Sequence, residues 1–223
     1  MRIRDRIDEY TWLLPETQHL IASPVSGVER VPLYRIGREQ ARATSLVRYA
    51  PGSHFEAHDH PYGEEFLVLE GEFADEQGRY PAMTWVQNPH GSSHRPFSET
   101  GCLLFVRLRQ MAADNSVQRV IPLEPTCPLS GSHETLLHRH RETEVSWLRA
   151  ATAVRIARSA SFHAQEALIV RGRVEWQTDQ VRELWPRSWI RVPPGCPLRL
   201  TMLEPSLIYV RVSPNSCGDP AIQ

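Results

Sequence analysis

The chain has 223 residues, of which 41% are hydrophobic and 23% charged, and its 25 basic and 26 acidic side chains leave a formal net charge of −1. These values are those of an ordinary globular protein that is long enough to bury a core. The balanced charge, without a long basic block, argues against binding to nucleic acid. No apolar stretch approaches the ~20 residues of a membrane-spanning helix.

The first 19 residues are expected to form an N-terminal extension. They lack the apolar core and the small-residue cleavage site of a secretory signal, and residues 4–14 hint at a helical segment. Four cysteines lie far apart without a C-x-x-C pair, which favours free thiols in a reducing cytoplasm over a zinc knuckle. These are Cys102, Cys127, Cys196 and Cys217. A cytoplasmic protein is therefore expected.

The rest of the chain consists of short apolar runs separated by turn residues. Eighteen prolines and twelve glycines interrupt runs such as EEFLVLEGEF, CLLFVRLRQ, EALIVRGRVEW and SLIYVRVSP. Short β-type runs with regular turn signals are typical of a sandwich or a barrel. The sequence therefore predicts an all-β fold.

The strand pattern occurs twice. The segment EFLVLEG at 65–71 is echoed by EALIVRG at 166–172, an offset of 101, and NPHG at 88–91 is echoed by VPPG at 192–195, an offset of 104. Loops tolerate a difference of this size. We therefore expect two copies of one barrel, at 20–112 and 130–214, joined by a linker at 113–129 and followed by a tail at 215–223.

Four side chains of the first copy have the types and spacing of metal ligands. His58 and His60 are two residues apart, so on a strand both side chains leave the same face. Glu64 follows the turn-prone segment 61–63, and His94 begins a later apolar strand. Three imidazoles and a carboxylate suit zinc, iron, manganese, nickel or copper, and intrinsic affinities do not choose among these metals.

These residues resemble the two motifs of the cupin superfamily. The pattern G-x5-H-x-H-x3-E-x6-G begins at Gly52, and P-x-G-x2-H begins at Pro89. The resemblance implies two tandem jelly-roll barrels, the second degenerate. It also implies one divalent transition metal per chain (zinc, iron, manganese or nickel, with zinc favoured), bound by His58, His60, Glu64 and His94.

The second copy keeps none of the ligands. At the two offsets the equivalent residues are Ser159, Ser161, Gln165 and Leu198. This copy is therefore interpreted as a scaffold or an interface. Its tryptophans are expected to pack in the core, with a small apolar ligand as the alternative. They are Trp147, Trp176, Trp185 and Trp189.

Other histidines are interpreted as structural. The run from His138 through His140 to Glu144 also reads H-x-H-x3-E, but it lacks the flanking glycines and is expected to be a polar approach to a strand. His163 and Glu166 alone are too few donors for a strong site. Three residues flank the predicted ligands and are expected in loops: His54, Tyr62 and His90.

More narrowly, residues 43–110 resemble the C-terminal cupin of ChrR-type anti-sigma factors, although the zinc-binding helical domain of that family has no counterpart here. The resemblance implies a sensory or regulatory stress-response protein, whose pocket receives a small molecule or an oxidant and which needs a partner protein. The alternative is a metal-dependent enzyme such as a dioxygenase, with unknown catalytic residues, and a third hypothesis is a purely structural metal. Exposed barrel edges also favour a homodimer.

Overall fold

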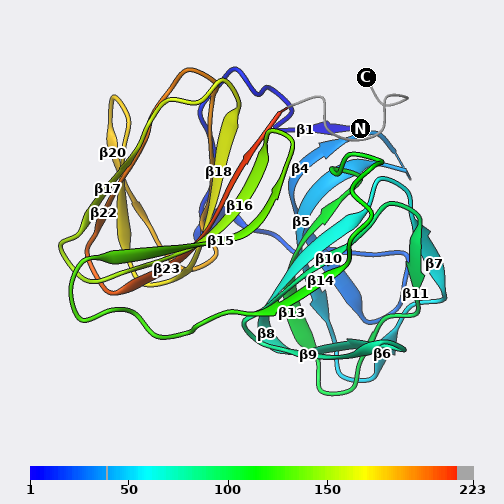
Figure 1. Ribbon diagram of the computed structural model, residues 1–223. Coiled ribbons are helices and arrows are strands. Elements are labelled where there is room, and N and C mark those ends of the chain that lie inside the picture. Colours follow the sequence, from blue (N-terminus) through cyan, green and yellow to red (C-terminus); the bar gives the residue numbers. More distant parts are fainter. Residues whose placement is uncertain (39, 215–223) are drawn as a thin grey trace. The chain divides into compact units, whose positions relative to one another are not determined.

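The computed structural model describes residues 1–38 and 40–214, and these residues form 23 strands and no α-helix (Figure 1). The predicted all-β class is therefore confirmed. Two compact units are present: Met1–Asp5 with His19–Glu124, and Arg6–Gln18 with residues 125–214. The predicted tail at 215–223, including Cys217, lies outside the described residues, and the three described cysteines are free thiols.

The hint of a helix at residues 4–14 is wrong. Part of this stretch is strand β2 (Thr11–Leu13), which pairs with β21 (Trp189–Val192). A helix of so few residues is marginal in water, whereas the neighbouring strand offers a complete set of backbone partners. A 3-10 turn, η1 (Pro15–Thr17), follows β2.

The first unit contains a large antiparallel sheet and a separate two-stranded ladder. Its strands are β1 (Arg2–Ile3), β3 (Ile21–Ala22), β4 (Val28–Ile36), β5 (Arg42–Tyr49), β6 (Ser53–His54), β7 (His58–His60), β8 (Glu64–Asp75), β9 (Gly78–Pro81), β10 (Thr84–Asn88), β11 (Ser92–His94), β12 (Phe97–Ser98), β13 (Cys102–Leu108) and β14 (Arg119–Pro122). The main path runs β1-β4-β5-β13-β8-β10-β14, and β7 pairs with β11. Figure 1 draws these strands in colours from blue through cyan to green.

The core of the first unit explains where the predicted carboxylate ligand lies. Side chains alternate between the two faces of a strand, so Glu64 shares its face with Phe66 and Val68. Both of these belong to the buried apolar cluster that also contains Leu104 and Val106. Glu64 is itself buried, so the strand directs this carboxylate inward.

The second unit contains two antiparallel sheets. Besides β2, its strands are β15 (Ser132–His140), β16 (Thr143–Ala150), β17 (Arg155–Arg158), β18 (Ala164–Arg171), β19 (Val174–Gln177), β20 (Val181–Leu184), β21, β22 (Leu198–Met202) and β23 (Ser206–Ser213). The sheets run β15-β16-β23-β18-β21-β2 and β17-β22-β19-β20. Its core includes Leu198, which is completely buried at the position that His94 would occupy under the sequence offset.

The β8–β13 ladder of the first unit and the β18–β23 ladder of the second share one register, which confirms the predicted duplication. Glu64 pairs with Leu108 on β13, and Gln165 pairs with Val212 on β23, as the offsets of 101 and 104 require. The ladder shifts by one residue between Leu103 and Leu104, and the equivalent shift lies between Ile169 and Arg171. A bulge retained at the same place in both copies is a designed feature of the barrel.

A buried tryptophan–glutamate pair is also common to both units. Trp85 Nε1 donates a 2.9 Å hydrogen bond to Glu65, and Trp189 Nε1 donates a 3.2 Å bond to Glu166. Trp147, Trp176 and Trp189 are almost completely buried, as expected, whereas Trp185 is 46% exposed. Glu166 thus bonds to Trp189, whereas His163 pairs with Glu142 at 3.2 Å.

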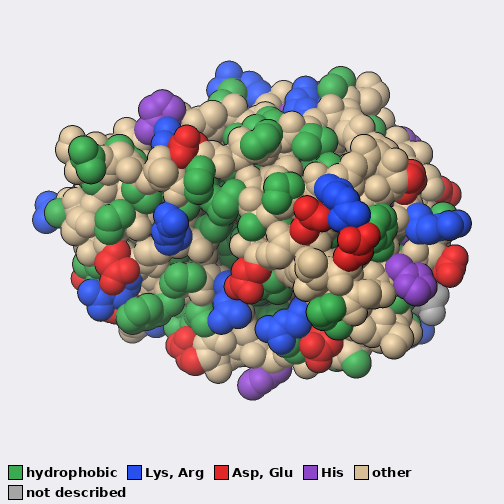
Figure 2. All heavy atoms as spheres, turned by 90° about the horizontal axis from the view of Figure 1, so that it is seen from below, with side chains coloured by type: hydrophobic (Ala, Val, Ile, Leu, Met, Phe, Trp, Pro, Cys, Tyr) green, Lys and Arg blue, Asp and Glu red, His purple; other side chains and the backbone are tan. Residues whose placement is uncertain are grey.

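Basic and acidic side chains are interspersed on the face shown in Figure 2, without one sign gathering into a single patch there. Mixed charges of this kind keep a surface hydrated without attracting one class of charged partner. Among the described residues, no helix has the length and apolar character needed to cross a membrane.

Candidate metal centre

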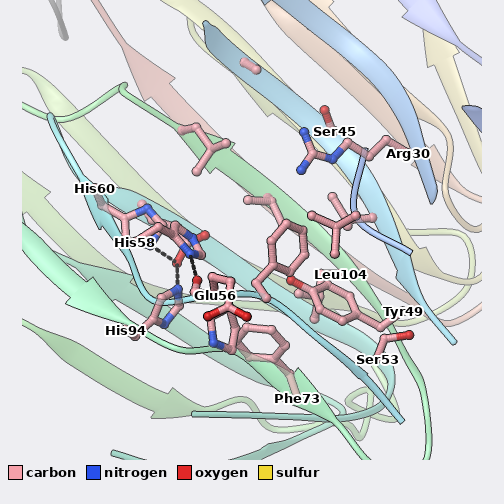
Figure 3. A pocket seen from close by; sticks show the side chains of 18 of the residues that line it. Arg30, Ser45, Tyr49, Ser53, Glu56, His58, His60, Phe73, His94 and Leu104 are labelled. Atoms are coloured by element: carbon pink, nitrogen blue, oxygen red, sulfur yellow. Dashed lines mark hydrogen bonds and ion pairs between the residues drawn. The ribbon is translucent and has the colours of Figure 1, made fainter. Parts of the chain in front are cut away.

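Two short strands and one turn bring the four predicted ligands together in the first unit, and Figure 3 shows the three histidines side by side. His58 and His60 lie on β7, which pairs with β11 so that His94 is directly opposite His58. After β7 the chain reverses through Tyr62 and Gly63, both with positive φ, and reaches Glu64 at the start of β8. The turn therefore adds the carboxylate to the histidine ladder.

The three histidines point at one another. One ligand nitrogen from each of His58, His60 and His94 lies within 4.8 Å of the others. Their ring centroids are 4.7–5.2 Å apart and mutually tilted. Glu64 Oε2 is 3.5 Å from Nε2 of both His60 and His94. All four predicted ligands are therefore gathered in one cluster.

The chemistry of this cluster fits a divalent metal ion. Nε2 of His60 and Nε2 of His94 are buried and have no hydrogen-bond partner, which is costly for a polar atom. Two donors bonded to one metal at ~2.1 Å lie about 3.0–3.4 Å apart, close to the separations of 3.5 Å that Glu64 makes. A bound ion would satisfy both nitrogens at once.

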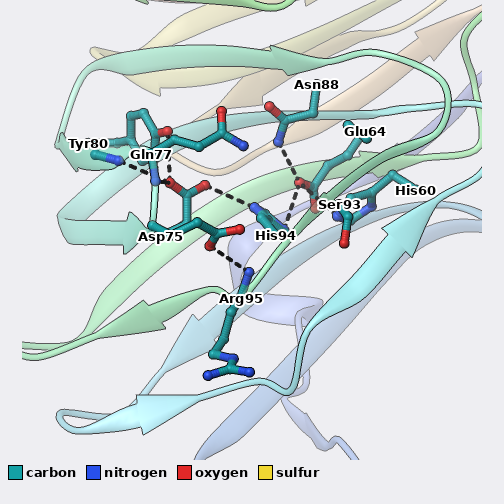
Figure 4. A network of polar contacts seen from close by, with 12 residues as sticks. His60, Glu64, Asp75, Gln77, Tyr80, Asn88, Ser93, His94 and Arg95 are labelled. Carbon is teal, nitrogen blue, oxygen red and sulfur yellow. Dashed lines mark hydrogen bonds and ion pairs between the residues drawn. The ribbon is translucent and has the colours of Figure 1, made fainter.

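Two hydrogen bonds fix which ring nitrogen His94 and His58 direct toward the cluster. His94 Nδ1 donates to Asp75 Oδ2 at 3.0 Å (Figure 4), and His58 Nδ1 donates to the backbone oxygen of Glu56 at 2.9 Å. Each bond places the proton on Nδ1 and leaves Nε2 as a lone-pair donor. Partners of this kind set the tautomer and orientation of metal-binding histidines.

Asp75 is in turn held by several donors. Its Oδ1 accepts hydrogen bonds from the backbone N–H groups of Gln77 and Gly78 and from the hydroxyl of Tyr80, at 2.9–3.2 Å. On the other side of the cluster, Asn88 Nδ2 donates to Glu64 Oε2 at 3.1 Å. Both carboxylates are therefore fixed in orientation by contacts within the protein.

These contacts shift the pKa values of the cluster in opposite directions. Burial lowers the pKa of His60, against the attraction of Glu64, which favours the neutral imidazole that a metal needs. Burial also acts to lower the pKa of His94, but the bond to Asp75 and the charge of Glu64 raise it overall. Burial acts to raise the pKa of Asp75, but bonds from His94, Gln77 and Tyr80 lower it overall.

A cavity of about 840 Å³ opens beside the histidines within the first unit. Part of its wall is apolar, from Val47, Tyr49, Phe73, Leu104 and Val106. This volume lies in the usual range of small-molecule sites. The cluster therefore faces a space that can admit an organic molecule.

Comparison with known families agrees with this geometry. Residues 12–112 match the family described as the ChrR cupin-like domain. A solved cupin 2 conserved barrel domain protein from Leptotrichia buccalis has a TM-score of 0.60 at 8% identity, covering 86% of this chain and 91% of that one. The family match covers less than half of the chain, and it confirms the predicted resemblance to the cupin superfamily and to the ChrR cupin.

Two further solved structures share the fold of this cupin. A proposed dioxygenase from Nostoc punctiforme has a TM-score of 0.70 at 10% identity, covering 97% of this chain and 86% of that one. The bacterial pirin YhhW from Escherichia coli, in complex with nickel(II), has a TM-score of 0.69 at 13% identity, covering 92% and 99%. The cupin matches no curated protein. At these identities the likeness establishes the fold alone.

In the second barrel the equivalent residues bond to the backbone and do not form a ligand set. Gln165 donates to the backbone oxygens of Ser159 and Cys196 at 3.0 and 3.2 Å, and Ser161 accepts the backbone N–H of His163. Within the part of the chain that the structure describes, only His58, His60 and His94 form a three-donor group.

The second H-x-H-x3-E run lies in the hairpin of β15 and β16. The rings of His138 and His140 are stacked with centroids 6.2 Å apart, while Glu144 pairs with Arg139 at 2.8 Å. The carboxylate is therefore engaged elsewhere. Of the residues expected in loops, His90 accepts the backbone N–H of Tyr62, and His54 lies on β6 and lines the cavity.

Sequence reasoning missed Asp75 and Asn88, although both contact the cluster. Asp75 precedes the turn at residues 76–77, where an aspartate usually has only a local role. Its contact with His94 spans 19 residues and depends on how β8 and β11 are placed. The sequence carries no signal for this contact.

Replacing Asp75 by Asn is expected to weaken metal binding by about 10–100-fold, because the oriented partner of His94 loses its charge. Competition with a chromophoric chelator measures this change. Asp59→Asn removes a carboxylate from the exposed side of β7 and serves as the matched control, with an expected change of less than about threefold. Equal affinities of the Asp75→Asn variant and the unaltered protein would contradict a role for Asp75 in positioning His94.

Proposed function

We propose that this cupin is a metal-dependent enzyme of the oxygenase class that acts on a small organic molecule. The observation that supports this proposal is that the histidine cluster lines a cavity of about 840 Å³. A structural metal site is closed by its protein ligands, whereas a catalytic site keeps an open position. The cavity offers room for a substrate at such a position.

In this proposal Nε2 of each histidine and the carboxylate of Glu64 hold one divalent ion. A bound iron or manganese ion would supply Lewis-acid and oxygen-activating chemistry. Asp75 orients His94, and Asn88 orients Glu64. Because Glu64 also lines the cavity, its carboxylate is placed to accept a proton from a substrate bound there.

The apolar wall would exclude water around the reacting groups. Tyr49 and Phe73 pack edge to face with centroids 5.5 Å apart, and both line the cavity. Burial, followed by the charge of Glu64, raises the pKa of Tyr49 well above its usual value of 10. The Tyr49 hydroxyl therefore stays neutral at physiological pH and is available only as a hydrogen-bonding group.

The test begins with the metal content of protein purified from its own host. Iron or manganese near one equivalent, followed by substrate-dependent oxygen uptake in the reconstituted protein, is the expected result. Oxygen uptake should be absent after reconstitution with zinc, which has no redox chemistry. Protein purified without any metal, and unable to take one up from solution, would overturn the proposal.

The second candidate function is a ChrR-like sensory or regulatory role, which the family match over residues 12–112 favours. In that role a small molecule or oxidant at the metal would alter an interaction with a partner protein in the cytoplasm. Zinc at one equivalent, no turnover, and co-purification of one host protein that dissociates on oxidant treatment would support it. Turnover of an organic substrate without a partner would count against it.

A further inference from the structure

One region of the cavity wall is basic. Arg30 and Arg35 of β4 line it together with Ser45 of β5 and Gln40. Figure 3 shows the Arg30 guanidinium next to Ser45 and apart from the three histidines, with Tyr49 and Leu104 on another part of the wall. The cavity therefore has a histidine region, an apolar wall and a cationic region.

The two guanidinium groups lack a compensating carboxylate within the described residues. Arg30 and Arg35 are half-buried, and the Nε of each is buried without a hydrogen-bond partner. Arg35 donates to the backbone oxygen of Arg38, which is a neutral acceptor. Burial lowers the pKa of Arg35, and the positive charge of Arg30 lowers it further. Two like charges therefore line the same cavity.

An anion bound beside these groups would balance their charge. A guanidinium presents a planar fork of donors that matches a carboxylate, and such charge-assisted bonds are about twice as strong as neutral ones. In a partly buried site the attraction is less screened than at the surface. The neighbouring apolar wall of Tyr49, Phe73 and Leu104 would bury the uncharged part of the same molecule.

We propose that the cavity binds an organic carboxylate, with its charged group at Arg30 and Arg35 and its apolar body against Tyr49, Phe73 and Leu104. The inference deepens the proposed function by naming the substrate class, and only the orientation of the apolar body toward the histidines rests on that function. The carboxylate site itself is made by β4 and β5 and needs no metal.

The experiment is calorimetric titration of the metal-free full chain with phenylacetate, 3-phenylpropionate and 4-phenylbutyrate, each compared with its neutral amide. At least one acid is expected to bind about tenfold more tightly than its amide, which corresponds to ~1.4 kcal/mol. Arg30→Gln and Arg35→Gln are each expected to remove most of this preference. Arg48→Gln is the matched control, because Arg48 is exposed on neighbouring β5, and it should keep the preference.

The outcomes separate this inference from the proposed function. The carboxylate site is overturned if no acid binds more tightly than its amide. It is also overturned if Arg30→Gln and Arg35→Gln both keep the acid preference of the unaltered protein. A preference that appears only in zinc-loaded protein and disappears with His94→Ala also overturns it, because the carboxylate then binds the metal. An arginine-dependent preference in a chain that takes up no metal would support the carboxylate site while contradicting the metal-dependent enzyme.

Discussion

Replacing His94 by alanine is expected to weaken metal binding by more than about 100-fold, beyond the 10–100-fold typical of losing a residue that only orients a ligand. The side chain is 2% exposed, and its Nε2 lies 3.5 Å from Glu64 Oε2. Removing the ring takes away one of three imidazoles and the hydrogen bond that His94 donates to Asp75. The loss is measured by chelator competition at pH 8.

The interpretation of this variant depends on the barrel remaining folded. His60→Ala removes a second buried ligand from the adjacent strand β7 and is expected to give a loss of similar size. His140→Ala removes a histidine from the second unit, so its metal affinity should be unchanged. Far-ultraviolet circular dichroism of the metal-free forms checks the fold. Tight, stoichiometric binding in both His94→Ala and His60→Ala would contradict the proposed centre.

Replacing Gly71 by alanine is expected to destabilise the first unit by roughly 2–5 kcal/mol. Gly71 has a φ of +73°, and a Cβ added there would lie 2.1 Å from the backbone oxygen of Gly101. The left-handed conformation alone costs roughly 1–2 kcal/mol for a residue with a side chain. Separating two paired backbones adds roughly 1–3 kcal/mol of overpacking, because Gly71 pairs with Cys102 in the ladder.

Gly52→Ala separates these two contributions. Gly52 has a similar φ of +77°, but no atom lies within 4 Å of an added Cβ. This variant is therefore expected to lose only about 1–2 kcal/mol. Urea denaturation of the metal-free proteins measures both free energies of unfolding. Equal losses in the two variants would show that the close approach of Gly101 has no energetic cost.

The metal cluster and the fold class were predictable because their signals are local or periodic. His58 and His60 share a strand face by simple alternation, and the turn at residues 61–63 places Glu64 next to them. Two copies of the same glycine and strand pattern then imply one barrel twice. The pairing of Gln165 with Val212 in the ladder agrees with the offsets read from the sequence.

The remaining features depend on the packing of strands that are distant in sequence. Asp75 reaches His94 only because the hairpin of β8 and β9 lies beside β11, and no spacing rule connects the two residues. Arg30 resembles an ordinary charged strand residue until the cavity is seen, since exposed and pocket-lining arginines share the same local pattern. The helix predicted at residues 4–14 is wrong because apolar spacing alone is also compatible with a short helix. Pairing with β21 determines the conformation of β2 within this stretch.

The shared register of the two barrels has a consequence for metal acquisition. A Cβ added to Gly172 would clash with the backbone oxygen of Pro205, just as one added to Gly71 would clash with that of Gly101. The bulge and the tryptophan–glutamate pair are also retained. The second barrel keeps all of this while Leu198 stands at the position of His94. Barrel closure therefore does not require coordination, so the first barrel can fold before an ion arrives. An ion bound at the proposed centre would then be selected by the ligands of the folded barrel and by the metals available in the cell.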